Sequence, residues 1–392
     1  MDHSVISGTA RTPFGKLGGV LASKTAVELG TIALEAAISR SGIDPVTITK
    51  VIFGHVLQGG TGQNAARQVG VAAGLELTTT AETVNRVCGS GLLALANADN
   101  LIRLQEHEAI AIGGMESMSQ APYFVRNARF GYRMGPGEFE DLVQVDGLFS
   151  NIDHRRMGDQ ADLVAHEQQM TRERADAWAL RSHQRAIAAH DGGKLADELV
   201  PVLVQQKRDT ISVTADEAPR RDTSAEALAR LKPVFNPDGL VTAGNAPGLN
   251  DGASAAIITS ERFAREHGLP VKAVVLAHAD VAWDIPYLAL TPAMAAEKAL
   301  AKAGIPAGDV DLWEINEAFA SVALISTDRL GIDPERVNVN GGAIAIGHPL
   351  AASGPRLVMT LIEELHRRGG GIGVAAMCSG GGQGDAIVLR VS

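Results

Sequence analysis

Cysteine is scarce in this 392-residue chain, which has only Cys88 and Cys378. Two cysteines are too few for the disulfide framework of a small secreted fold, and residues 1–6 lack the basic and apolar segments of a secretory signal. No stretch approaches the roughly 18 uninterrupted apolar residues of a membrane span. We therefore expect no membrane partner and a reducing compartment, the cytoplasm. A mature form that has lost a targeting peptide would have the same features.

Positive charge is also in short supply. Forty-five acidic residues outweigh 35 basic ones, which gives a formal net charge of -10 at pH 7. Broad electrostatic binding to nucleic acid or to an anionic membrane requires the opposite sign. We expect neither partner, and an anionic ligand would have to meet a local basic patch.

Aromatic residues make up only 4% of the chain, whereas glycine is abundant, with 43 residues. Glycines between apolar runs suit tight turns from strand to helix. At about 150 residues per domain, the length allows two to three domains. This pattern favours an α/β protein.

Two segments of the chain are similar to each other. Four residues recur at a constant offset, namely Glu35, Ala37, Gly42 and Ile43 as Glu297, Ala299, Gly304 and Ile305. Met115 and Met377 share that offset, which argues against chance matches. We predict duplicated halves, with helices at 25–41 and 291–303, strands at 51–53 and 312–315, and mixed, largely parallel sheets covered by helices.

Between the halves the composition becomes polar and irregular, with many arginines and one amphipathic helix at 172–190. Such a segment is a natural place for a lid or a ligand-binding region. We expect an N-terminal half at 1–118 completed by 249–270, an inserted loop domain at 119–248, and a C-terminal half at 271–392.

Both cysteines follow strand-like runs and precede glycine. Cys88 lies before a helical pattern at 92–104, where unpaired N–H groups and the helix dipole favour a thiolate. Cys378 precedes three glycines, whose backbone can approach a substrate and donate to an oxyanion. Each suits catalysis, although a small buried cysteine or a tight structural turn would produce the same local pattern.

Two further residues have side chains that suit the same chemistry. His348, between glycine and proline, is held in a turn before a helix at 356–368, where a neutral imidazole can accept a thiol proton. Asn316 follows the strand at 312–315 and can orient a water or a carbonyl. A structural histidine and a helix-capping asparagine are the alternatives.

Taken together, these motifs resemble the signature set of the thiolases, in order and in spacing. The set comprises V-C-G-S-G at 87–91, N-E-A-F-A at 316–320, G-H-P at 347–349 and C-S-G-G-G-Q-G at 378–384. The resemblance extends through 10–16, 62–68, 113–119 and 239–252, and so covers essentially the whole chain. It implies the thiolase fold, in which two α/β halves form five α-β-α-β-α layers and carry an inserted loop domain.

The resemblance implies acyl transfer between coenzyme A thioesters through a cysteine thioester. Cys88 would be the nucleophile, His348 its base, and Cys378 the acid and base at the substrate α-carbon or leaving thiol. Asn316 would hold a water that stabilises the enolate together with His348, and the backbone N–H groups of Cys88 and Gly380 would form the oxyanion hole. No metal and no permanently bound cofactor is implied.

Coenzyme A would be a substrate and product, and the family pattern indicates where this chain binds it. The implied contacts are Arg220, Arg221, Met157, Ala243, Pro247, Ala318 and Phe319. Four positions depart from the family: Pro247 replaces a serine, Arg156 a histidine and Ala351 a glycine, and Leu288 stands in place of a methionine-glycine pair near the acyl pocket. They put coenzyme A affinity and acyl-chain preference in doubt.

The similarity to short-chain biosynthetic members at 115–122 and 231–233 predicts a homo-oligomeric acetyl-CoA C-acetyltransferase of lipid metabolism, a dimer or a tetramer. Its substrates would be acetyl-CoA, acetoacetyl-CoA or another 3-ketoacyl-CoA. A 3-ketoacyl-CoA thiolase of β-oxidation is the alternative. A decarboxylating ketoacyl synthase would have histidine or asparagine at Cys378, and a non-catalytic acyl-CoA binding protein would lack one of Cys88, His348 and Cys378.

Overall fold

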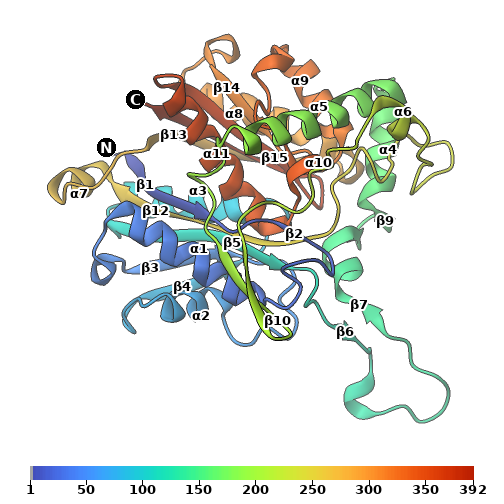
Figure 1. Ribbon diagram of the computed structural model, residues 1–392, viewed down its shortest axis with the longest axis horizontal. Coiled ribbons are helices and arrows are strands. Elements are labelled where there is room, and N and C mark those ends of the chain that lie inside the picture. The colour runs from blue at the N-terminus through green and yellow to red at the C-terminus, as the bar shows by residue number, and fades with distance from the viewer. Residues whose placement is uncertain (1–2) are drawn as a thin grey trace.

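A mixed ten-stranded sheet runs through the computed structural model, which describes residues 3–392 (Figure 1). The strand order is β14-β15-β16-β13-β1-β12-β5-β3-β4, and β2 pairs with β12. The strands of this sheet are β1 Ser4–Arg11, β2 Gly15–Lys16, β3 Lys50–Gly54, β4 Thr80–Val84, β5 Ala109–Ser117, β12 Asn250–Ser260, β13 Ala273–Ala282, β14 Leu312–Ile315, β15 Gly371–Ser379 and β16 Gln383–Val391. A short antiparallel pairing of β1 with β13, in the middle of this order, joins the two parts of the sheet.

The expected predominance of parallel pairing is wrong, although the sheet is mixed as predicted. Only β3/β4, β3/β5 and β14/β15 are parallel, whereas β1/β12, β5/β12, β13/β16 and β15/β16 are antiparallel. The alternation of helices and strands predicts parallel neighbours only where a helix connects them. Here β15 and β16 are joined by a three-glycine turn, and β12 returns from the insertion to lie between β1 and β5.

Helices form two outer layers and one central layer against the two parts of the sheet, and further helices belong to the insertion and the connections. The helices are α1 Ala26–Ser41, α2 Ala65–Ala72, α3 Ser90–Arg103, α4 Met157–Glu167, α5 Arg172–Asp191, α6 Ala225–Ala229, α7 Glu261–Glu266, α8 Thr291–Ala303, α9 Ala320–Leu330, α10 Ala343–Ile346 and α11 Ser353–Arg367. Helices α1 and α8 cover the outer faces of the two parts of the sheet, while α3 and α11 touch each other between them. This arrangement confirms the five-layered α/β fold.

The core follows the same layering, with one apolar cluster at each helical layer. One cluster lies under α1, a second under α8 and α9, and a third surrounds α3 and α11. The repeated residues occupy matching places: Gly42 and Gly304 both end an outer helix in the left-handed conformation, with φ of 68° and 69°. Met115 and Met377 lie in the matching strands β5 and β15.

The insertion has more regular structure than the sequence indicated. Besides α5, it contains α4, α6 and the short strands β6 Tyr123–Phe124, β7 Glu140–Asp141, β8 Phe149–Ser150, β9 Arg155–Arg156, β10 Val202–Gln206 and β11 Asp209–Val213. Buried ion pairs of Arg11 with Glu198 and Asp216 fasten it to the first strand. The segment 123–141 extends away from the body as an arm (Figure 1). The expected domain boundaries stay a prediction.

Among residues 3–392, no helix combines the length and the apolar character needed to cross a membrane.

Candidate active site

The loop that carries Cys88 is strained. It connects β4 to α3, and Val87 adopts a left-handed backbone conformation with φ of 47°. A β-branched residue rarely adopts that conformation, and such strain persists only where the surroundings enforce it. As the sequence predicted, Cys88 lies just before a helix, because Gly89 is the N-cap of α3. The loop therefore depends on contacts from elsewhere in the chain.

Those contacts come from the C-terminal hairpin of β15 and β16. The Ser379 hydroxyl donates to the carbonyl of Arg86 and accepts from the N–H of Gly89 at 3.2 Å. The Arg86 side chain donates to Asp385 on β16 at 2.6 Å. Thus the C-terminal half fixes the loop that carries the cysteine of the N-terminal half.

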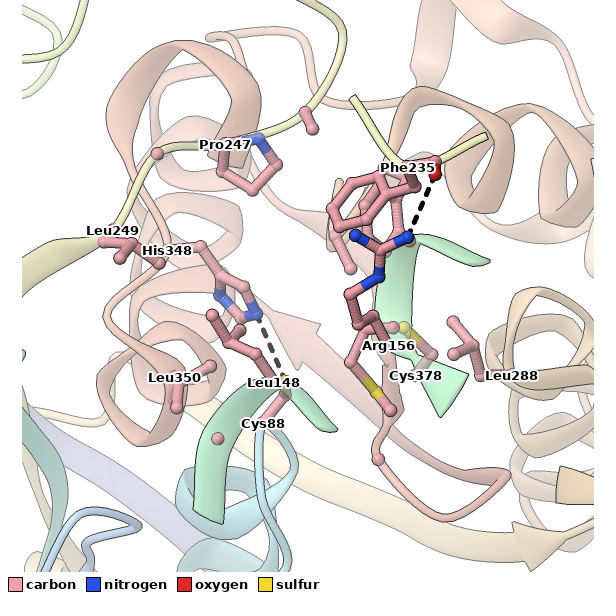
Figure 2. A pocket seen from close by; sticks show the side chains of 18 of the residues that line it. Cys88, Leu148, Arg156, Phe235, Pro247, Leu249, Leu288, His348, Leu350 and Cys378 are labelled. Carbon is pink, nitrogen blue, oxygen red and sulfur yellow. Dashed lines mark hydrogen bonds between the residues drawn. The ribbon is translucent and has the colours of Figure 1, made fainter. Parts of the chain in front are cut away.

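The sulfur of Cys88 lies 3.3 Å from Nε2 of His348 (Figure 2). The imidazole is itself held at two points: its Nδ1 is 2.6 Å from the Ser353 hydroxyl, and the backbone N–H of His348 donates to the Asn250 side chain at 2.8 Å. With the Nδ1 proton donated to Ser353, Nε2 is free to accept a proton from the thiol.

Burial keeps both members of this pair uncharged. It raises the pKa of the Cys88 thiol to about 12, although hydrogen bonds from the N–H groups of Cys88 and Gly380 act in the opposite direction. Burial, with a smaller contribution from the Arg356 charge, lowers the pKa of His348 to about 3. The local N–H groups thus favour the thiolate as the sequence predicted, but desolvation acts in the opposite direction and is the larger cause.

Both residues line an apolar cavity of about 320 Å³, and Cys378 and Gly380 join them there (Figure 2). Cys378 is buried near the end of β15, and both burial and the neighbouring Cys88 raise the pKa of its thiol. The remaining lining residues are Met118, Gln144, Gly147, Leu148, Arg156, Met157, Gly158, Val234, Phe235, Ala246, Pro247, Gly248, Leu249, Leu288, Ala318, Phe319, Leu350 and Ser379.

The structure brings together some of the expected ligand-binding residues and separates others. Those that line the cavity are Met157, Pro247, Ala318 and Phe319, and the family departures Arg156 and Leu288 lie there too. Those that do not line it are Asn316, Ala243, Arg220 and Arg221. The two arginines are exposed, and Arg221 forms an ion pair with Asp191 at the end of α5.

Asn316 does not line the cavity, but its buried side chain has an unusual environment. Neither its Nδ2 nor its Oδ1 has a hydrogen-bond partner within the described chain. Buried amides are normally paired, so the unpartnered side chain fits a place for an ordered water.

Sequence reasoning missed three residues that shape this site: Ser353, Asn250 and Ser379. Ser353 lies five positions after His348, so a hydroxyl close to the histidine in sequence could have indicated a hydrogen-bond partner for its ring. Asn250 and Ser379 act on loops that are distant in sequence, so no local pattern identifies them.

A thiol that shares a hydrogen bond with a neutral imidazole, beside backbone N–H donors, defines a site for covalent catalysis by a cysteine nucleophile. Comparison with known proteins identifies the family to which the chain belongs. Residues 4–262 match the family model "Thiolase, N-terminal domain" and residues 269–391 match "Thiolase, C-terminal domain". The chain belongs to the thiolase family, as the sequence motifs predicted.

Individual relatives are similar along their full length. A probable acetyl-CoA acetyltransferase of Mycolicibacterium smegmatis is 46% identical over 98% of this chain and 100% of its own. The crystal structure of the Bacillus anthracis acetyl-CoA acetyltransferase has a TM-score of 0.98 at 40% identity, and that of human mitochondrial 3-ketoacyl-CoA thiolase has 0.97 at 41%. Both alignments cover 100% of this chain and 99% of the other.

Proposed function

We propose that the protein is an acetyl-CoA C-acetyltransferase that converts two acetyl-CoA to acetoacetyl-CoA and coenzyme A, and the reverse, through an acetyl-Cys88 intermediate. The observation that carries the proposal is the 3.3 Å contact between Cys88 Sγ and His348 Nε2 at the apolar cavity. Relatives named acetyl-CoA acetyltransferase, similar over full length, support this choice of substrate.

In the first half-reaction, Cys88 attacks the thioester carbonyl of acetyl-CoA while its proton passes to Nε2 of His348. The two N–H groups of Cys88 and Gly380 face the sulfur and are placed to bind the oxyanion of the tetrahedral intermediate. The intermediate collapses to acetyl-Cys88 as the C–S bond to coenzyme A breaks. Cys378 supplies the proton to the leaving thiolate and is left as a thiolate itself.

In the second half-reaction, this Cys378 thiolate removes a proton from the α-carbon of a second acetyl-CoA. The enolate oxygen accepts hydrogen bonds from His348, which carries the proton from the first step, and from a water at Asn316. The unpartnered Asn316 amide supports that water site. The enolate carbon attacks acetyl-Cys88, a C–C bond forms, and the Cys88 sulfur leaves and recovers its proton from His348.

The size of the acyl group is tested by thiolysis of a series of 3-ketoacyl-CoA substrates. The cavity measures about 320 Å³, and Leu288 and Phe319 are among the apolar side chains that line it. We expect kcat/KM for acetoacetyl-CoA to exceed that for a ten-carbon 3-ketoacyl-CoA at least about tenfold, because the additional methylenes must find space in a cavity of this volume. Equal or higher kcat/KM for the longer substrate would favour the β-oxidation alternative, whose candidate relative is the human 3-ketoacyl-CoA thiolase.

Coenzyme A is a polyanion, and the exposed Arg220 and Arg221 are our candidates for its nucleotide end. Reversal of both charges, in Arg220→Glu/Arg221→Glu, is expected to raise the KM for coenzyme A in thiolysis about tenfold and to leave kcat within about twofold. Steady-state kinetics over a range of coenzyme A concentrations measures both constants. Arg208→Glu, which reverses another exposed charge on the β10–β11 turn, is the matched control. A fall in kcat at unchanged KM would contradict this role.

We propose that the protein is a homo-oligomer, a dimer or a tetramer, assembled in part through the arm at 123–141. Phe130 and Met134 on this arm are each 93% exposed in the single chain. Large apolar side chains exposed in this way are typical of a surface that another protein chain covers. Phe130→Ser/Met134→Ser should therefore lower the molar mass measured by light scattering after size exclusion. Leu203→Ser, at an exposed leucine outside the arm, is the control. An unchanged molar mass in the arm variant would contradict the assignment.

A reducing compartment such as the cytoplasm suits a site that requires two free thiols, and neither Cys88 nor Cys378 is in a disulfide. Formation and cleavage of an acetoacetyl thioester would place the reaction in lipid metabolism.

A further inference from the structure

The side chain of Glu317, directly after Asn316, is a buried carboxylate that accepts four hydrogen bonds. Its Oε1 accepts from Trp178 Nε1 at 2.9 Å and from Asn338 Nδ2 at 3.0 Å. Its Oε2 accepts from the Ser182 hydroxyl at 2.7 Å and from the backbone N–H of Ile344 at 3.1 Å. A carboxylate in the interior is costly unless its lone pairs are filled, and here four donors fill them.

The donors come from three separate parts of the chain that meet at the site. Trp178 and Ser182 belong to α5 of the insertion, and Ile344 belongs to α10, four residues before His348. The Asn338 amide also pairs with the backbone of Ile315, accepting from its N–H and donating to its carbonyl, both at 2.8 Å. Asn316 is therefore held on both sides, through Ile315 and through Glu317.

The approach of the segment before His348 to this carboxylate is unusually close. A Cβ on Gly342 would lie 2.3 Å from the carboxyl carbon of Glu317, so a larger residue there would force the carboxylate to shift. The Gly342 N–H donates to the Ser182 hydroxyl at 3.0 Å, and that hydroxyl donates to Glu317. Glu317 thus holds the segment before His348 at two points. It accepts directly from the N–H of Ile344, and it contacts Gly342 through the Ser182 hydroxyl.

We propose that Glu317 is a positioning residue that sets Asn316 and His348 relative to each other, an inference that rests on the proposed function. Stabilisation of the enolate oxygen needs the His348 ring and the Asn316-held water at one point, and small displacements of such donors are costly. Neither Glu317 nor its four donors lines the cavity. Loss of the carboxylate should consequently lower kcat without weakening substrate binding.

The principal test is Glu317→Gln, which keeps the size of the side chain but replaces one acceptor oxygen with a donor. We expect kcat for acetoacetyl-CoA thiolysis to fall at least about tenfold while KM stays within about twofold. Leu34→Ala, which opens a cavity under α1 in the opposite outer layer, lowers the thermal midpoint as a control for stability. An equal loss of kcat in Leu34→Ala, or a kcat of Glu317→Gln within twofold of wild type, would overturn the proposal.

A second variant keeps the test independent of how well Glu317→Gln folds. Ser182→Ala removes one donor and should lower kcat severalfold in the same direction. The double variant Ser182→Ala/Glu317→Gln should lose less kcat than the product of the two single losses, because Ser182 and Glu317 share a contact. Losses that multiply in the double variant contradict a shared positioning role.

The rate at which iodoacetamide alkylates Cys88, followed by peptide mass analysis that resolves Cys88 from Cys378, gives a readout that needs no turnover. Displacement of His348 in Glu317→Gln should slow this alkylation severalfold. Alkylation of Cys88 at the wild-type rate would overturn the positioning role. Absence of acetoacetyl-CoA thiolysis in the wild-type protein would instead refute the proposed function, and the alkylation rates would still decide the role of Glu317.

Discussion

Replacement of Cys88 by alanine is expected to lower kcat for acetoacetyl-CoA thiolysis by roughly 10⁴-fold or more. Without the sulfur no acetyl-enzyme forms, and the neutral His348 has no thiol proton to accept. The residual rate would come from substrate binding and from the backbone N–H groups of Cys88 and Gly380. Initial rates of acetoacetyl-CoA consumption measure the change, with circular dichroism to establish that the variant is folded.

Cys88→Ser is the matched control for this prediction. A serine hydroxyl keeps a hydrogen bond to His348 and has nearly the same volume as the thiol. It is, however, a poorer nucleophile towards a thioester, and the alkoxide that must leave its acetyl ester is a poorer leaving group than a thiolate. Its activity should be strongly reduced as well, so that the sulfur rather than the shape of the loop accounts for the loss. A Cys88→Ala variant with a tenth or more of wild-type kcat would show that another residue carries the acyl group.

Replacement of His348 by alanine is expected to lower kcat/KM by about 10³-fold near neutral pH. The imidazole, whose burial-lowered pKa of about 3 keeps it neutral, accepts the proton of a thiol whose pKa burial raises to about 12. Neither group of the wild-type pair changes charge between those values, so this pair contributes no inflection to kcat/KM from pH 6 to 9. In His348→Ala the thiol must lose its proton to water before it can attack. The kcat/KM of this variant should therefore rise about tenfold per pH unit from pH 6 to 9.

The measurement is a pH profile of kcat/KM for wild type and His348→Ala. Ser353→Ala, which leaves the imidazole in place but removes the partner of Nδ1, should show a smaller loss of about tenfold. It should also keep the flat profile of the wild type. Parallel profiles for wild type and His348→Ala would contradict the general-base role.

Much of the fold could be predicted from local sequence. The bounds of α8 and β14 agree with the predicted helix at 291–303 and strand at 312–315, because a proline at the helix start and a short, mostly apolar run are strong local signals. Strand direction could not be predicted in the same way. The position of β12 between β1 and β5 depends on pairing across the whole insertion, which no local pattern records.

In the candidate site, too, local motifs could be predicted from the sequence, whereas features that depend on long-range contacts could not. Cys88, His348 and Cys378 stand in short glycine-bounded motifs, and these motifs allowed them to be selected before any geometry was known. The protonation of Cys88 could not be predicted in this way, because its pKa depends on burial in the folded chain and on the N–H groups of Cys88 and Gly380, which lie far apart in sequence. The four donors to Glu317 come from distant segments, so its part in the site emerges only when the chain is folded.

The most direct test of the central claim is to trap the acyl-enzyme. The protein is mixed with acetyl-CoA, quenched in acid within one turnover, and digested for peptide mass analysis. Our account predicts one acetyl group on the peptide that contains Cys88, removed again when coenzyme A is added before the quench. Acetyl on the Cys378 peptide, or turnover with no covalent acetyl on either cysteine, would contradict it.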